Sequence, residues 1–293
     1  MKIDKRYKGI ICIIASAFCF ATMNLFLHLA GDLPFWQKGF FRNAIALLFA
    51  LTILIKERKV KAAIITKQNF PLLLGRAAFG TAGLLCNFYC VDHMNISDAS
   101  MLNKLAPFFA IVFSAIFLKE KAKWYQWGAV AVAFAGSLFI VKPSFGMQVF
   151  PAIIGICGGL GAGVAYTCVR KLGSMETPGA LIVFFFSAFS VILLGPIVGF
   201  TYVPMTLKQW IFLLLTGLAA SGGQFFVTAA YTYAPAKEIS VYDYSQVIFA
   251  AIWGMLFLGQ LPDLFSVLGY VIIVSVAIAM YIKTKKEARE GAA

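Results

Sequence analysis

The chain has 293 residues, of which 61% are hydrophobic and only 13% are charged. Soluble proteins carry about 25% charged and about 45–50% apolar residues, so a soluble globular fold is excluded. The net charge of +13 does not indicate nucleic acid, because the basic residues form short clusters between apolar runs instead of one basic face. The composition therefore predicts an integral membrane protein whose surroundings are the lipid bilayer.

Apolar runs of membrane-spanning length recur along the whole chain. A helix needs about 20 apolar residues to cross a bilayer, and backbone polar groups in lipid must be satisfied within the helix. The runs lack the alternation of barrel strands, so the predicted fold class is all-α. The first run is too long for a signal-peptide core of about 7–15 residues and is expected to be retained. Ten transmembrane helices are predicted, at approximately 9–30, 35–55, 70–91, 98–118, 124–141, 148–170, 178–200, 208–231, 238–258 and 264–282.

Positive charge is distributed unevenly between the two sets of loops. With the N-terminus on the inner side, the inner segments hold 19 of the 25 Lys and Arg residues. The outer loops hold only Lys142 and Lys208. Cytoplasmic loops of membrane proteins carry this excess, so both termini are predicted to be cytoplasmic. The short loops and small size favour a multi-pass protein of a bacterial cytoplasmic membrane, acting as a monomer or homodimer.

The two halves of the chain, residues 1–143 and 144–293, resemble each other at a constant offset of 140 residues. The segment that begins at Ser97 aligns with the segment that begins at Lys237. Because each half holds an odd number of spans, the second half must enter the membrane from the opposite side. The aligned pairs are Ser100 and Ser240, Phe109 and Phe249, Ala110 and Ala250, Phe117 and Phe257, Leu118 and Leu258, Thr81 and Ser221, and Gly83 and Gly223.

Inverted repeats of this kind are typical of secondary transporters, whose substrate site lies between the halves near the midplane. The predicted function is therefore transport of a small metabolite by alternating access. An intramembrane enzyme and a channel are the alternatives. An enzyme would need a nucleophile and base or a metal cluster, but the chain has only two histidines, His28 and His93, at no metal-ligand spacing. We expect no metal, no cofactor and no ATP hydrolysis, so a gradient or exchange supplies the energy.

Three segments resemble a known family. They are FFRNAIALL in the second span, Asp98–Pro107 leading into FFAIVFSAIFLKEK, and YDYSQVIFAAIWGMLFLGQLPD in the ninth span. With the five-plus-five plan, they make the whole chain similar to EamA-domain members of the drug/metabolite transporter superfamily. The resemblance implies a fold of two inverted five-helix halves around a central cavity. It also implies transport of metabolites such as amino acids by alternating access. The ninth and tenth spans look most similar to members that carry nucleoside-containing metabolites such as S-adenosylmethionine.

The same resemblance implies an acidic residue after the fourth and ninth spans. Glu120 matches the first of these positions. Gln260 departs from the second, although Asp263 is close to it in the sequence. The family often has an arginine at the position of Arg42. For that side chain a structural role and a substrate contact remain equal alternatives.

Charged side chains inside spans point to a cavity or a partner, because each costs at least about 2.5–3.5 kcal/mol on insertion scales. Counted along a straight helix, Arg42 lies about 12 Å and Lys104 about 9 Å from the outer face. Asp243 lies about 8 Å from the inner face, at the depth of Arg76. This predicts an Arg76–Asp243 ion pair across the halves, or a proton-coupling or amine-binding role for Asp243. A pair that forms in only one state would act as a gate. Lys38 is expected to extend its side chain to the outer interface.

Uncharged polar side chains also fall in the spans. Ser100, Asn103, Lys104 and Pro107 share one helical face, and their repeat counterparts are Ser240, Asp243, Tyr244 and Val247. A shared face in both halves predicts cavity lining, with hydrogen bonding between helices as the alternative. Pro107 leaves a carbonyl near Asn103 without its donor, which could serve as a ligand or hinge. The other candidates are Asn24, Asn87, Gln224 and Thr228 for the cavity, and Tyr89, Tyr166, Tyr242 and Trp253 for aromatic walls or packing.

Two further expectations follow from the same spans. Arg42, Arg76 and Lys104 outnumber the single carboxylate of Asp243, so the substrate is expected to carry a carboxylate or another anionic group. Gly155, Gly159 and Gly163 recur every four residues in the sixth span, which predicts close packing against neighbouring helices. A nucleotide-binding loop is not expected there, because no strand precedes the glycines.

Overall fold

The computed structural model describes residues 5–56, 65–117, 123–141, 149–233 and 242–290, and within these ranges the regular structure is entirely helical. The predicted all-α class is confirmed for this part of the chain. The helices are α1 (Lys5–Leu29), α2 (Phe35–Lys56), α3 (Phe70–His93), α4 (Ile96–Asn103), α5 (Ala106–Phe117), α6 (Trp124–Val141), α7 (Val149–Ser174), α8 (Gly179–Thr201), α9 (Leu207–Tyr233), α11 (Ser245–Leu258) and α12 (Leu264–Glu290).

Seven stretches within the described ranges are long and apolar enough to cross a membrane. One of them, Ile96–Phe117, combines α4 and α5. Two further apolar helices, Trp124–Ile140 and Ser245–Leu258, are shorter. These lengths and compositions make the chain a multi-pass membrane protein. The seven stretches are Tyr7–Leu29, Phe35–Lys56, Ile96–Phe117, Val149–Ser174, Gly179–Thr201, Leu207–Ala230 and Leu264–Lys283.

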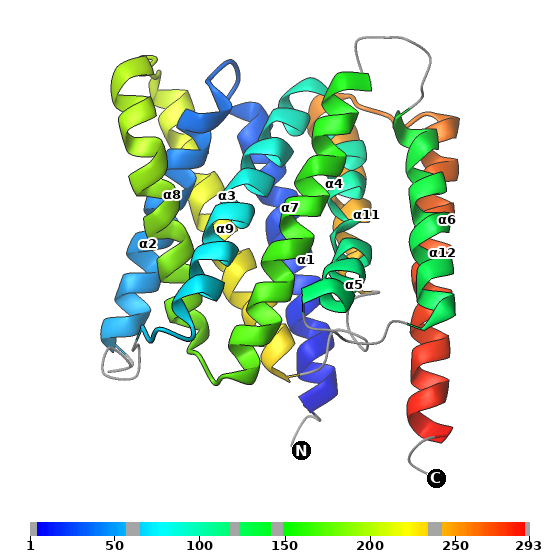
Figure 1. Cartoon of the computed structure of the whole chain (residues 1–293). Coiled ribbons are helices and arrows are strands. Elements are labelled where there is room, and N and C mark those ends of the chain that lie inside the picture. Colours follow the sequence, from blue (N-terminus) through cyan, green and yellow to red (C-terminus); the bar gives the residue numbers. More distant parts are fainter. Residues whose placement is uncertain (1–4, 57–64, 118–122, 142–148, 234–241, 291–293) are drawn as a thin grey trace.

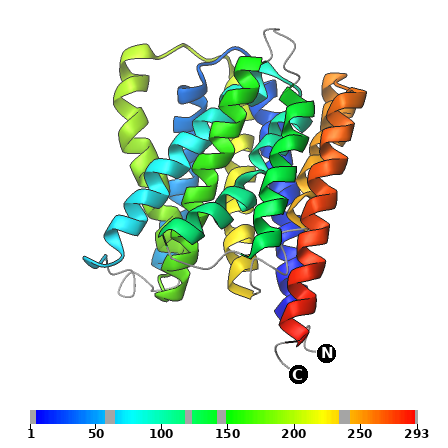
Figure 2. The ribbon, with the colours of Figure 1, turned by 45° about the vertical axis from the view of Figure 1, so that its right-hand side comes forward.

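The helices stand side by side in one bundle, and both chain ends lie at the same end of it (Figure 1). The main contacts join α1 with α9, α3 with α7, and α2 with α8. The pair formed by α6 and α12 stands at one edge of the bundle, as the turned view also shows (Figure 2). Large apolar side chains such as Phe200, Leu264 and Ile192 are exposed on the outer surface, as expected where lipid is the solvent.

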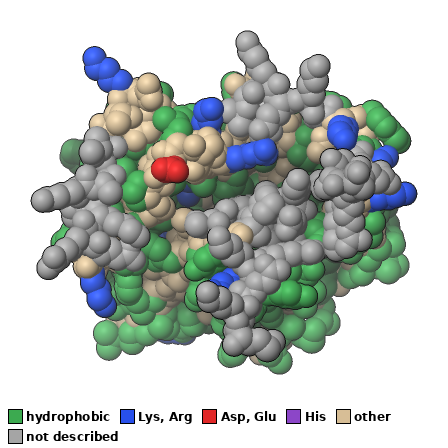
Figure 3. Space-filling model, turned by 90° about the horizontal axis from the view of Figure 1, so that it is seen from below, with side chains coloured by type: hydrophobic (Ala, Val, Ile, Leu, Met, Phe, Trp, Pro, Cys, Tyr) green, Lys and Arg blue, Asp and Glu red, His purple; other side chains and the backbone are tan. Residues whose placement is uncertain are grey.

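The end of the bundle that carries both termini is basic. Figure 3 views this face and shows Lys and Arg side chains spread around its rim. The exposed basic residues at helix ends include Lys8, Lys56, Lys67, Arg170 and Lys171. This face of the folded molecule therefore exposes part of the positive charge that the sequence places in the inner loops.

The fourth predicted span is interrupted. α4 ends at Asn103, Lys104 and Leu105 form a turn, and α5 begins at Ala106. Pro107 lies in the first turn of α5 and has no N–H to donate to the carbonyl of Asn103, so a continuous helix would lose that bond. The continuous helix predicted over 98–118 is therefore wrong in its middle. A turn at Tyr244 also precedes α11, which begins at Ser245. Tyr244 is the repeat counterpart of Lys104.

Glycines allow α7 to approach its neighbours closely, as the sequence predicted. A Cβ atom at Gly159 would lie 2.9 Å from the carbonyl oxygen of Leu102, and one at Gly163 would lie 2.5 Å from the Cβ of Phe109. On another side of α7, a Cβ at Gly161 would lie 2.9 Å from the carbonyl oxygen of Phe79 in α3. The glycines of α7 thus place α3 and the α4–α5 interruption around one helix.

We expect Gly163→Ala to destabilise the protein by about 1–3 kcal/mol, because the added methyl meets backbone atoms of α5 that cannot move aside. Gly173→Ala in the same helix is the matched control, since nothing lies within 4 Å of its Cβ position. Thermal unfolding in detergent should show a lower midpoint for the first variant and no loss for the second. Equal midpoints would contradict the close packing.

Candidate functional site

A central cavity of about 80 Å³ lies between side chains of both halves. The candidates Arg42, Arg76, Asn87, Asn103, Lys104, Gln224 and Asp243 all line it. Three pairs of lining residues are 140 positions apart in the sequence, as repeat counterparts would be. These pairs are Leu84 and Gln224, Asn87 and Val227, and Asn103 and Asp243.

At this cavity an ion pair joins the turn between α4 and α5 to the turn that precedes α11. We call these two turns the chain interruptions. The Lys104 Nζ lies 2.6 Å from the Asp243 Oδ2, and the side chains of both residues are almost fully buried. The Tyr244 hydroxyl donates a hydrogen bond of 3.2 Å to the carbonyl oxygen of Lys104. The turn between α4 and α5 is thus bound through a side chain and through its backbone to the turn that precedes α11.

The predicted Arg76–Asp243 ion pair is wrong, because Asp243 pairs with Lys104 instead. The error came from counting depth along straight spans, which placed Lys104 and Asp243 near opposite faces. Both residues in fact lie at chain interruptions, where the two spans meet inside the bundle. Arg76 lies with its guanidinium carbon 4.2 Å from the centre of the Phe186 ring.

Arg42 and Arg76 share the ring of Phe186. The guanidinium carbon of Arg42 lies 5.6 Å from the centre of this ring, and its Nη1 donates to the Oδ1 of Asn43. Gly80, one turn after Arg76 in α3, leaves room for this arrangement, because a Cβ there would overlap the Arg76 guanidinium. α2, α3 and α8 therefore hold two buried cations beside one aromatic ring.

A chain of hydrogen bonds links the remaining candidates to the cavity. Asn24 donates to the Oγ of Ser100 over 3.2 Å, and Asn87 donates to the Oδ1 of Asn24 over 3.5 Å. Of these three residues, only Asn87 lines the cavity itself. Asn24 and Ser100 are fully buried beside it, and Tyr244 packs in a hydrophobic cluster, so these candidates support the lining residues. Ser240 lies outside the described residues.

The aromatic candidates separate into two groups. Tyr166 lines the cavity. Tyr89 stacks on His93 with ring centres 4.0 Å apart, and the Trp253 indole donates to Thr22. Phe186 and Gln246 also line the cavity but were not predicted. Gln246 is an amide inside a span and meets the criterion that selected Gln224, whereas nothing in the sequence separates Phe186 from the packing phenylalanines.

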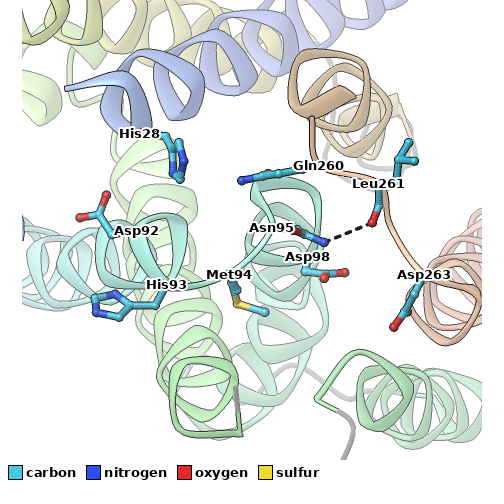
Figure 4. Close-up of a pocket in the computed structure, with 9 residues that line it drawn as sticks. All are labelled: His28, Asp92, His93, Met94, Asn95, Asp98, Gln260, Leu261 and Asp263. Atoms are coloured by element: carbon cyan, nitrogen blue, oxygen red, sulfur yellow. Dashed lines mark hydrogen bonds between the residues drawn. The ribbon is translucent and has the colours of Figure 1, made fainter. Parts of the chain in front are cut away.

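A second pocket of about 410 Å³ lies where α3 is followed by α4 and α11 by α12, at the end of the bundle away from the termini in Figure 1, and Figure 4 shows its lining. Gln260 crosses it and accepts a hydrogen bond of 3.0 Å from the backbone N–H of Ile96, the first residue of α4. Asn95 donates to the carbonyl oxygen of Leu261 over 3.5 Å. We call this pocket the vestibule. Its lining is polar and acidic and consists of His28, Asp92, His93, Met94, Asn95, Asp98, Gln260, Leu261 and Asp263.

Lys38 lies buried beside the vestibule instead of extending to the interface. Its Nζ lies 2.6 Å from the Oδ1 of Asp92, and only 1% of the residue is exposed. The expectation for Lys38 is therefore wrong. The carboxylate of Asp92 follows the apolar run that was counted as the third span, so it was not considered as a partner.

The bundle of apolar helices and the polar cavity between them define a multi-pass membrane transporter. The chain matches the EamA-like transporter family over residues 7–142 and 149–282, and it belongs to that family. It is 33% identical over 289 residues to the pseudopaline exporter CntI of Pseudomonas aeruginosa strain UCBPP-PA14, covering 98% of this chain and 100% of the exporter.

Two further proteins extend this likeness. The riboflavin transporter of Brucella anthropi is 25% identical over 266 residues, which cover 86% of this chain and 90% of that protein. A crystal structure superposes with a TM-score of 0.69 and 13% identity, over 96% of this chain and 98% of the other. The relatives are named as transporters of small metabolites, and the crystal structure supports the fold.

Proposed function

We propose that the protein is a secondary transporter that moves a small metabolite by alternating access between two inverted five-helix halves, residues 1–143 and 144–293. The ten spans of this proposal include α3, α6 and α11 in addition to the seven long apolar stretches. A gradient or exchange drives the movement, without a cofactor. The substrate is an amino acid or a related organic compound, in keeping with the small metabolites named for the relatives.

The pattern of helix contacts supports an inverted repeat. If α1, α2, α3 and α6 correspond to α7, α8, α9 and α12, contacts that join unlike helices should come in matching pairs. α1 contacts α9 as α7 contacts α3, α5 contacts α7 as α11 contacts α1, and α2 contacts α9 as α8 contacts α3. The contacts of α2 with α8 and of α6 with α12 join counterparts. A two-fold relation between the halves predicts this pattern.

The observation that carries the proposal is the meeting of the two chain interruptions at Lys104 and Asp243. Transporters with inverted repeats place their substrate at discontinuous helices near the midplane. The cavity here measures about 80 Å³, whereas sites for small molecules measure about 300–1,000 Å³. We infer that this is a closed state, and that the halves separate at the ion pair to admit the substrate.

The basic end of the bundle is proposed to face the cytoplasm, which places both termini inside and the vestibule outside. The membrane is proposed to be a bacterial cytoplasmic membrane, with the protein as a monomer or homodimer. The vestibule, at about 410 Å³, is large enough to serve as the outer entrance or exit. Arg42, Asn87, Asn103, Lys104 and Gln224 are proposed to contact the substrate.

Counterflow in proteoliposomes tests this function. Vesicles loaded with unlabelled candidate metabolites should accumulate the same labelled metabolite transiently, and uptake should saturate. A channel would give flux without counterflow, and an intramembrane enzyme would return a changed compound. Either result would replace the proposal with one of these two alternatives.

A further inference from the structure

Two buried arginines at the cavity have donors that no group of the described residues accepts. The Nε of Arg42, the Nε of Arg76 and the Nδ2 of Asn43 are buried and lack a hydrogen-bond partner among the described residues. Arg42 is 1% exposed and Arg76 is 6% exposed. Buried polar groups are almost always paired, and Arg42 and Arg76 both line the cavity, so their unpaired donors indicate a site for acceptors from outside the protein.

The two guanidinium groups are close enough to act on one small molecule. Their carbons lie 5.6 Å and 4.2 Å from the same Phe186 ring centre, so they can be no more than 9.8 Å apart. Gly80 leaves the space that the Arg76 guanidinium occupies. A planar guanidinium donates two parallel hydrogen bonds to a carboxylate, which a lysine ammonium cannot do.

The charge of the cavity indicates the charge of the ligand. Its lining includes Arg42, Arg76 and Lys104 but only one carboxylate, Asp243, so the described lining residues carry a net charge of +2. Asp243 is already paired with Lys104, and no carboxylate of the described residues forms an ion pair with either arginine. Uncompensated charge is strongly unfavourable in a buried site. A ligand with charge −2 neutralises the lining completely.

We propose that Arg42 and Arg76 form the anion site of the substrate, and that the substrate is a small dicarboxylate. This inference rests on the proposed transport function and specifies its substrate class. One carboxylate binds between the two guanidinium groups near Phe186. The second lies toward Lys104, where it competes with Asp243 for the ammonium group. Binding of the substrate thereby loosens the ion pair that holds the two interruptions together.

Thermal shift of the purified full-length protein tests this site without requiring transport. The probes are straight-chain dicarboxylates of four to six carbons, their monoamides and their diamides, each at millimolar concentration. We expect the melting midpoint to rise most with a diacid, less with its monoamide and not at all with the diamide. Stabilisation equal for diacid and diamide, stabilisation by phosphate esters only, or no response to any diacid would overturn the proposal.

Variants of the site separate geometry from charge. Arg76→Gln should weaken diacid binding by about 10- to 100-fold, the loss expected when charge-assisted hydrogen bonds are removed. Arg76→Lys keeps the charge but loses the planar fork, so binding should stay at least tenfold weaker than in the wild type. Gly80→Ala should weaken binding by displacing Arg76, whereas Gly173→Ala should leave it unchanged. Unchanged binding in both Arg76 variants would overturn the assignment.

The two proposals fail in different ways. If diacids bind in an arginine-dependent manner but show no counterflow, the anion site stands and the transport of diacids does not. If other metabolites show counterflow that is unaffected by Arg76→Gln, the transporter stands and the anion site does not.

Discussion

Asp243→Asn abolishes counterflow while leaving the protein folded. The amide oxygen of Asn can still accept a hydrogen bond from the Lys104 ammonium, so the contact between the two interruptions is weakened but not lost. The substitution removes the negative charge that forms the ion pair at 2.6 Å and the only carboxylate lining the described cavity. Both a gating and a proton-coupling role require that charge.

The measurement is counterflow in proteoliposomes at matched protein density, with size-exclusion profiles and melting midpoints as the test of folding. Asp32→Asn is the matched control, because Asp32 is exposed between α1 and α2 and lines neither the cavity nor the vestibule. This control should transport at nearly the wild-type rate. If Asp243→Asn also does so, Asp243 has neither the coupling nor the gating role.

Lys104→Met destabilises the protein by about 3–5 kcal/mol, because Asp243 is then buried without its partner. Replacing both residues, as in Lys104→Met with Asp243→Leu, should restore stability to the wild-type level or above it. A well-packed apolar pair in place of a buried ion pair is often neutral or stabilising by about 1–4 kcal/mol. The double variant should nevertheless fail to transport, because an apolar contact cannot be exchanged for a contact with a charged substrate.

Thermal unfolding of the wild type, Lys104→Met, Asp243→Leu and the double variant forms a double-mutant cycle. This cycle isolates the interaction energy of the Lys104–Asp243 pair. Counterflow of the double variant is measured alongside it. A double variant as unstable as Lys104→Met would mean that these side chains are not coupled. A double variant that transports normally would mean that the ion pair is dispensable for the conformational change.

Much of the fold was predictable because lipid imposes a simple rule on the sequence. The second and seventh spans, predicted at 35–55 and 178–200, agree closely with α2 at Phe35–Lys56 and α8 at Gly179–Thr201. The interruption at Lys104 was missed because hydropathy continues through it. Pro107 gave the correct signal for a hinge, but hydropathy cannot indicate where the broken helix resumes.

The site was predictable in its charges but not in its pairing. Arg42, Arg76, Lys104 and Asp243 were found because charges are rare in membrane spans, and all four line the cavity. The partner of Asp243 was assigned wrongly because depth was counted as if each span were one straight helix. Phe186 was missed because its role depends on which arginines lie across it, and only the packing of α8 against α2 and α3 determines that.

The central claim, that one cavity between the halves opens to either side of the membrane, is tested most directly by thiol labelling at Asn103. This residue lines the cavity at the end of α4. Asn103→Cys, in a chain whose six native cysteines are replaced, is exposed to a membrane-impermeant thiol reagent in right-side-out and in inside-out vesicles. The account predicts labelling from both sides, with Asp243→Asn shifting the balance toward one of them. Labelling from neither side, or from the same single side in every variant, would contradict it.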